Sequence, residues 1–350
     1  MGLPNIRIEF VTKAGTAIKR GSRGIVAIIL IETTAGVYEY ETITDIPIST
    51  FTADNESYIK RTFLGGINPI KKVVVIATDT VTNGLIEAEK HKFDYIVGPH
   101  DVSTEDATAI STAVKAWRDN KKKKVKVILP NTTGDHEGII NFTTASIVVG
   151  EDTFTTSEYC SRIAGLIAGT PLQESITFKV LSEVTDVPKY TDAEFDTKIN
   201  NGELCIKWDG EKAKIARGIN SLKTVGNTKS DDMKSIKIID IMDMIENDIR
   251  TTAEDNYIGK YANNYNNKNV LVVAIRSYLD SLRAEELLEG NIYVGIDVQA
   301  TKTYLDSKNV DTSTMKDIDI KKENTGTNVF IEGKYKITNA IEDISIKFYV

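Results

Sequence analysis

The sequence predicts an α/β (α+β) fold, in which a central α/β core carries a mixed C-terminal domain, a small β-rich N-terminal part and extended strands at both ends. Three observations lead to this class. Strand-like and helix-like segments alternate after Lys71, Ile25–Ile31 is an unbroken apolar run, and apolar and polar residues alternate near both ends. With 350 residues, of which 41% are hydrophobic, the sequence can form two or three domains without disulfides.

Changes in local pattern divide the sequence into five parts. These are an N-terminal arm (1–20), a small β-rich part (21–70), an α/β core (71–190), a C-terminal domain (191–332) and a C-terminal strand arm (333–350). A basic stretch with two glycines, from Lys19 to Gly24, predicts a hinge between the first arm and the body. The apolar strand that follows, up to Glu32, indicates burial on both faces of a sheet.

The alternation in the core favours a largely parallel sheet covered by helices. We predict strands at 73–77, 95–98, 125–129 and 146–150, and helices at 85–92, 105–118 and 157–168. Ser103 is the expected N-cap of the second helix. Ser157 is the expected N-cap of the third, which ends at Gly169 and whose small residues allow another backbone to approach closely.

After residue 190 the pattern is mixed. We predict helices at 192–199, around 238–249 and up to Gly290, and strands at 203–208, 212–217, 293–304, 327–331 and 334–350. Asn201-Gly202 and Asp209-Gly210 are strong turn signals between the first of these elements.

Both terminal segments show the period-two alternation of a half-buried strand. The residues on the apolar side are Ile6, Ile8 and Phe10 near the start, and Ile344, Ile346, Phe348 and Val350 near the end. An unpaired strand presents free N–H and C=O groups that can pair with another chain. Two interpretations are open at this point, namely pairing inside the same subunit and pairing between subunits.

The charge distribution argues against nucleic acid as a main partner. There are 43 Lys plus Arg against 50 Asp plus Glu, a net charge of −7, whereas duplex binding requires a basic face. The run Lys121–Lys124 is best explained as a solvated loop. The longest apolar run is far shorter than a membrane helix, so we expect no membrane insertion. Cys160 and Cys205 lie in apolar stretches without metal-like spacing, which indicates buried free thiols.

The sequence shows no recognisable catalytic, cofactor-binding or metal-binding motif. The three histidines, His91, His100 and His136, form no zinc-binding spacing, and the stretch Gly226–Ser230 lacks the glycine spacing of a phosphate loop. We therefore predict no enzyme and no cofactor. His100, which follows a predicted strand, is the best single candidate for a general base, so an α/β enzyme with a site at Gly98–Asp101 is kept as an alternative.

The order of these parts resembles the contractile tail sheath proteins of bacteriophages and of phage-tail-like bacteriocins, especially those of clostridial-type hosts. The resemblance extends from about Lys71 onward. The stretches that carry it are SEYCSRIAGLIAGTP (157–171), ARGINSLKT (216–224), YIGKYANNYNNK (257–268) and the final IEDISIKFYV (341–350).

The resemblance implies a structural subunit, made in the bacterial cytoplasm, of a virion tail or of a released bacteriocin particle. Six subunits would form a ring around an inner tail tube protein, with baseplate and terminator proteins at the ends of the stack. The terminal strands would pair with neighbouring subunits, while Gly21, Gly24 and Gly333 would act as hinges during contraction. Residues Arg276, Asp280 and Arg283 would form a charged stripe that can contact the tube, although such a stripe can equally be an ordinary solvated face. Another self-assembling shell or surface-layer protein is a further alternative.

Overall fold

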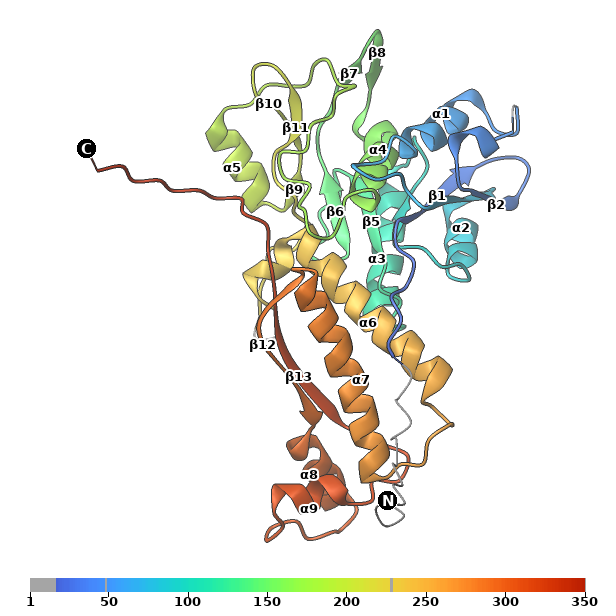
Figure 1. The fold of residues 1–350 in the computed structure, drawn as a ribbon. Helices are drawn as coiled ribbons and strands as arrows, with labels where there is room; N and C mark the ends of the chain where they lie inside the picture. Colours follow the sequence, from blue (N-terminus) through green and yellow to red (C-terminus); the bar gives the residue numbers. More distant parts are fainter. Residues whose placement is uncertain (1–16, 48, 227–228, 350) are drawn as a thin grey trace, which may run out of the picture. The chain divides into compact units, whose positions relative to one another are not determined.

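The computed structural model describes residues 17–47, 49–226 and 229–349, which fall into two compact units (Figure 1). Among the described residues, the sheet unit consists of 22–243 and 339–349, and the hairpin unit consists of 17–21 and 244–338. The chain therefore passes between the units after Gly21, after Asp243 and after Thr338.

The sheet unit is built on a seven-stranded sheet in the order β2-β3-β1-β4-β5-β6-β9. Its strands are β1 (Ile25–Ile31), β2 (Gly36–Tyr40), β3 (Lys72–Thr78), β4 (Tyr95–Val97), β5 (Lys126–Pro130), β6 (Ile139–Phe142) and β9 (Glu203–Leu204). In this sheet β2 and β3 pair antiparallel, and every other pair of neighbouring strands is parallel. The prediction of a largely parallel sheet is confirmed.

Helices cover both faces of this sheet. They are α1 (Ala53–Thr62), α2 (Val81–Ala88), α3 (Thr104–Asp119) and α4 (Thr156–Ala168). Alternate side chains of β1 enter two different cores. Val26, Ile28 and Leu30 pack with residues of α1 and α4, whereas Ile25, Ala27 and Ile29 pack with residues of α2 and α3.

This arrangement explains the unbroken apolar run of β1. Its first six residues are buried because helices lie on both sides of the strand. Burial of each large apolar side chain stabilises the fold by roughly 1.5–3 kcal/mol. The sheet unit therefore depends on β1, which lies between β3 and β4.

Helices α1 and α4 approach each other through glycines. A Cβ atom on Gly165 would lie 2.1 Å from the carbonyl oxygen of Thr62, and one on Gly169 would lie 2.4 Å from that of Asn68. The hydroxyl of Ser161 donates to the carbonyl of Tyr58 over 2.8 Å. The small residues of this helix thus serve close backbone packing.

Smaller elements complete the sheet unit. They are β7 (Ile147–Val149), β8 (Asp152–Phe154), α5 (Asp192–Asn200), β10 (Ile206–Trp208), β11 (Ala213–Ile215) and the first turns of α6 (Ile236–Asn256). β7 pairs with β8 and β10 pairs with β11, both as antiparallel hairpins.

The hairpin unit contains the rest of α6 together with an antiparallel pair of strands. Its other elements are α7 (Tyr265–Ala284), β12 (Leu288–Ile296), α8 (Val298–Ser307), α9 (Asp317–Lys322) and β13 (Ile331–Ile337). β12 and β13 pair from Leu288 opposite Ile337 to Ile296 opposite Ile331. The unit also includes residues 17–21. The N–H of Gly21 donates to the carboxylate of Asp248 in α6 over 2.8 Å.

The boundaries of the parts differ from the prediction. The stretch 21–70 is not a separate β-rich part, because β1 lies inside the main sheet and Ala53–Thr62 forms helix α1. Similarly, α5 and β9 to β11 belong to the sheet unit and not to a C-terminal domain that begins at residue 191. Contacts between distant parts of the sequence decide these boundaries.

Several elements also differ in detail. The N-cap of α4 is Thr155, whose side chain forms a capping box with Glu158, and not Ser157. The predicted strand at 146–150 is β7, a hairpin strand, and the strand that joins the main sheet there is β6, which the sequence analysis missed. The predicted strand at 293–304 ends at Ile296, because Asp297 caps helix α8.

We expect the substitution Gly165→Ala to lower the free energy of unfolding by about 3 kcal/mol, because the added methyl group must push a backbone carbonyl away. Urea denaturation followed by circular dichroism measures this change. The control is Gly226→Ala, where a Cβ atom meets nothing within 4 Å. Equal stability of the two variants would contradict the close packing of α1 and α4.

Candidate functional site

The residues after Thr338 form an extended segment that we call the arm (339–349). Figure 1 shows it as a trace without helix or strand that runs to the C label. The side chains of Ile344, Ile346 and Phe348 are 73%, 69% and 83% exposed. No described residue pairs with the arm as a strand, so pairing within the described part of its own subunit is not observed.

The prediction of a strand over 334–350 is therefore only partly correct. β13 accounts for residues up to Ile337, but from Ile344 onward no strand among the described residues pairs with the alternating segment. Val350 lies outside the described residues, as do Ile6, Ile8 and Phe10.

The β12–β13 hairpin has edges that no other described strand covers. Within the described residues each of its strands pairs only with the other, so each has one edge that no further described strand joins, although the carbonyl of Gly290 accepts from Arg283 over 3.3 Å. Helix α7 packs along β12, and Leu288, Ile292, Val294 and Ile296 are buried on that strand. The hairpin is thus held on a helix, and no third strand among the described residues joins it.

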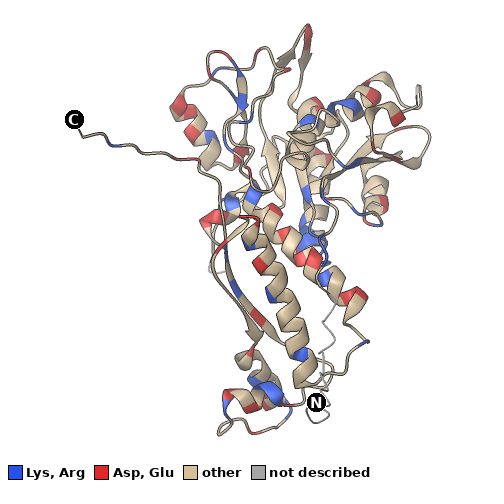
Figure 2. Ribbon diagram, in the orientation of Figure 1, with Lys and Arg blue, Asp and Glu red and all other residues tan. Residues whose placement is uncertain are grey.

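The charged stripe lies on α7 as the helical spacing predicts. Figure 2 shows basic and acidic residues at intervals along this helix. Asp280 forms ion pairs with Arg276 over 3.6 Å and with Arg283 over 2.9 Å. The side chains of Arg276, Asp280 and Arg283 are 54%, 34% and 45% exposed. Exposed pairs of this kind contribute little to stability, so the stripe is available for another contact.

The predicted hinge glycines occupy different environments. Gly21 is the last residue before the chain enters the sheet unit. Gly24 has a φ of +91°, and its N–H donates to Asp94 over 2.7 Å. Gly333 lies inside β13, opposite Val294. The last two are held in ordered backbone, so of the three only Gly21 lies at a boundary between units.

The alternative enzyme site at Gly98–Asp101 gains no support from its surroundings. A Cβ atom on Gly98 would meet Ile110 at 2.8 Å, and the ring of His100 lies 6.2 Å from that of Tyr58. A cavity of about 230 Å³ begins at Val102, but none of its lining residues is an acid or a base. They are Val102, Ser103, Thr104, Ala107, Pro130, Asn131, Thr132, Thr155, Thr156 and Ser157.

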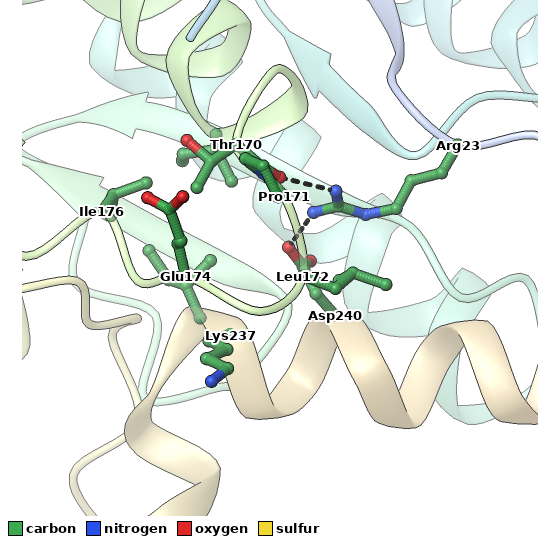
Figure 3. Close-up of a pocket in the computed structure, with 10 residues that line it drawn as sticks. Arg23, Thr170, Pro171, Leu172, Glu174, Ile176, Lys237 and Asp240 are labelled. Carbon is green, nitrogen blue, oxygen red and sulfur yellow. Dashed lines mark hydrogen bonds and ion pairs between the residues drawn. The ribbon is translucent and has the colours of Figure 1, made fainter. Parts of the chain in front are cut away.

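A second cavity lies beside Arg23, whose guanidinium donates to the carbonyl of Thr170 over 2.9 Å and pairs with Asp240 (Figure 3). Its volume is about 10 Å³, which is barely enough for one water molecule. The cavity is therefore a packing feature and not a ligand site.

One group of potential metal ligands occurs among the described residues, namely Asp119, His136 and Glu137. Burial alone would raise the pKa of Glu137, but the hydrogen bond from Lys229 and the charges of His136 and Arg118 outweigh it and lower the pKa to about 2. Lys229 lies 2.8 Å from this carboxylate. Protein cations already neutralise Glu137, so the group is best explained as an ion-pair network.

The first turns of α6 are fixed to the sheet by buried charges. Asp243 accepts two hydrogen bonds from Arg118, over 2.8 and 2.9 Å, and one from Lys126 over 2.7 Å. Asp240 lies 3.0 Å from Lys126 and accepts from the hydroxyl of Tyr95. Burial opposes ionisation of Asp240, but the charges of Lys126 and Arg23 lower its pKa. These contacts were not predicted, because nothing in the sequence indicates which distant charges meet.

Within the part of the chain that the structure describes, no helix combines the length and the apolar composition that crossing a membrane requires.

Comparisons with known proteins agree along most of the chain. Residues 75–221 match the family described as "Phage tail sheath protein central domain", and residues 228–350 match "Phage tail sheath C-terminal domain". The tail sheath protein of Clostridium phage phiCD119 is 40% identical over 306 residues, which cover 85% of each chain.

Solved structures share the fold, as two examples illustrate. The sheath tail protein of Desulfitobacterium hafniense is similar with a TM-score of 0.69 at 16% identity, over 84% of this chain and 94% of that one. The helical sheath of the anti-feeding prophage in its contracted state is similar with a TM-score of 0.73 at 14% identity, over 100% and 99% of the two chains.

We expect Asp243→Asn to lower the free energy of unfolding by about 3 kcal/mol, because it leaves Arg118 and Lys126 buried without their shared counter-charge. Urea denaturation measures the loss. The matched control is Asp231→Asn, which breaks an ion pair whose acid is 78% exposed and which we expect to cost less than about 0.5 kcal/mol. Similar losses in both variants would show that the network does not hold α6.

Proposed function

Because the chain belongs to the family of phage tail sheath proteins, we propose that it polymerises as stacked rings of six subunits around an inner tube and contracts to drive this tube through a cell envelope. In this proposal baseplate and terminator proteins close the ends of the stack. The family is structural, so the alternative of an enzyme with a site at Gly98–Asp101 is set aside, and so is that of a surface-layer or shell protein.

The observation that carries the proposal is the arm. Its side chains alternate, they are exposed, and its backbone has no partner strand among the described residues. In a strand without a partner, the backbone N–H and C=O groups form no hydrogen bonds to protein. A neighbouring strand can supply these bonds. Addition of a strand to the edge of an existing sheet is a common way to join subunits.

The acceptor that fits best is the β12–β13 hairpin of a neighbouring subunit. A two-stranded sheet is marginal by itself, and added strands stabilise it. The hairpin already rests on α7, so an incoming strand would meet a preformed edge. Ile344, Ile346 and Phe348 would then lie on one face of the enlarged sheet, as the alternation of the arm requires.

Contraction in this proposal needs no nucleotide. Paired arms keep neighbours connected while the bodies rotate and slide, and the energy comes from contacts that the bodies gain on compaction. Flexing is proposed at the passages between the units, after Gly21 and after Thr338. The positions of Gly24 and Gly333 in ordered backbone make them weaker candidates.

We expect Ile344→Asn combined with Ile346→Asn to raise the protein concentration needed for polymerisation at least tenfold. Both side chains are more than two-thirds exposed in the subunit and would be buried after pairing, at roughly 1.5–3 kcal/mol each. Sedimentation and negative-stain microscopy measure polymerisation, and the melting temperature of the monomer should not change.

The control for this test introduces the same residue on the other side of the arm, as Ser345→Asn with Lys347→Asn. This variant should polymerise within about twofold of the unmodified protein. Polymers formed equally well by both double variants, or by a chain that lacks residues 340–350, would contradict strand exchange.

The stripe on α7 is proposed to contact the tube. We expect Arg276→Glu with Arg283→Glu to reduce the fraction of sleeves that enclose a tube when the subunit is co-expressed with the tube protein of the same particle, because the stripe changes from basic to acidic. Each contact is worth only about 0.2–1 kcal/mol but repeats in every subunit. Electron microscopy counts filled and empty sleeves.

The matched control is Lys308→Glu with Lys316→Glu, which makes the same charge change at exposed positions on other elements of the hairpin unit. If both double variants enclose tubes equally often, α7 does not contact the tube.

A further inference from the structure

The arm does not leave the sheet unit as a free tail, because its root is held by side chains. The carboxylate of Glu342 is only 14% exposed. One of its oxygens lies 2.8 Å from the hydroxyl of Ser175 and 2.7 Å from that of Thr177, and the other accepts from Nε of Arg217 over 3.1 Å. These are charge-assisted hydrogen bonds, which are stronger than neutral ones.

Arg217 also holds the next residue of the arm. Its two terminal nitrogens donate to the carboxylate of Asp343 over 2.6 and 3.4 Å. The guanidinium therefore binds two consecutive acids at once. The hydrogen bond to Asp343 and the charge of Glu342 raise the pKa of Arg217, so its charge is secure at any physiological pH.

The protein side of this contact is built on ordered backbone. Arg217 comes two residues after β11, which pairs with β10. The N–H of Gly218 donates to the hydroxyl of Thr177 over 2.8 Å, and the N–H of Thr177 donates to Ser175 over 3.1 Å. The hydroxyls of Ser175 and Thr177 are thus held by contacts outside the arm, and Arg217 is placed by the backbone that follows β11.

Beyond Asp343 the arm makes no such contact. Residues 344–349 have no hydrogen bond to the rest of the described chain, and Tyr349 contacts only Lys347 of the arm itself, 5.7 Å from the ring centre. The held root and the free segment therefore meet between Asp343 and Ile344. In extended form the free segment spans about 20 Å, the length of an ordinary strand.

We propose that Ser175, Thr177 and Arg217 form a clasp that fixes the starting point and the register of the strand that the arm donates to a neighbouring copy of the chain. This inference rests on the proposed function. A slip of one residue would turn Ile344 and Ile346 to the opposite face of the acceptor sheet. The alternation of the free segment already disfavours such a slip once one face is buried, and fixed Glu342 and Asp343 add a second constraint at the root of the arm.

The clasp also limits the volume that the arm explores. Without it the free segment begins at Asn339, at the boundary between the units, and is nearly twice as long. The effective concentration of a tethered segment falls with about the −3/2 power of its length, which gives a decrease of roughly 2.5-fold for each link. The clasp is a positioning device and is not itself part of the strand interface.

The test breaks the clasp from each side. Arg217→Gln removes the cation, and Glu342→Gln with Asp343→Asn removes both anions while the arm keeps its length. Either variant should raise the concentration needed for polymerisation at least about twofold. The control is Lys90→Gln, which breaks an exposed ion pair with Glu87 on α2 and should have no effect.

A second measurement reports on the clasp in the monomer. A spin label on Ile341→Cys, which is 87% exposed and precedes the clasp, should be restricted in the parent chain and mobile in both clasp variants. The native Cys160 and Cys205 are buried and their thiol pKa values are raised by burial, so they do not compete for the label.

The outcomes separate the two proposals. Equal label mobility in the parent and both clasp variants overturns the clasp, and increased mobility with unchanged polymerisation overturns its role in register. A parent chain that never polymerises overturns the proposed function as well as this role, whereas the label still reports whether Arg217 holds the arm. If Arg217→Gln fails to fold, the double variant of the arm acids decides the question.

Discussion

The structure depends on the requirement that every backbone N–H and C=O group of an extended segment finds a partner. In the sheet unit this requirement is met inside the chain, where β1 pairs with β3 and with β4 and is covered by helices on both faces. In the arm it is not met among the described residues. The same physical rule thus distinguishes a sheet whose strands are paired from an arm that has no partner strand among the described residues.

The contacts inside the sheet unit are rigid. Gly165 admits the backbone of α1 at a distance that no side chain tolerates, and Asp243 binds two buried cations from two different elements. The arm is the opposite kind of element, because its apolar side chains are exposed to solvent.

The held part and the exposed part of the arm meet within one residue. Arg217 holds Glu342 and Asp343, and the next residue is already exposed and unpaired. A strand that is free over a defined length and fixed at a defined point loses less conformational freedom on pairing than a long tail does. In our proposal, the clasp therefore gives the free segment a single register when it pairs with a neighbouring subunit.

The sequence by itself determined the class of fold, the apolar strand β1, the capped helix α3 and the alternation of the arm, because these follow from local periodicity and capping. Together with the order of several short stretches, it also indicated the family. It did not reveal that residues 21–70 contribute the centre of the main sheet, that β6 exists, or that residues 298–304 are helical. Only the tertiary structure decided that Arg217 meets Glu342 and that Asp243 meets Arg118, because contacts across more than a hundred residues leave no periodic trace in the sequence.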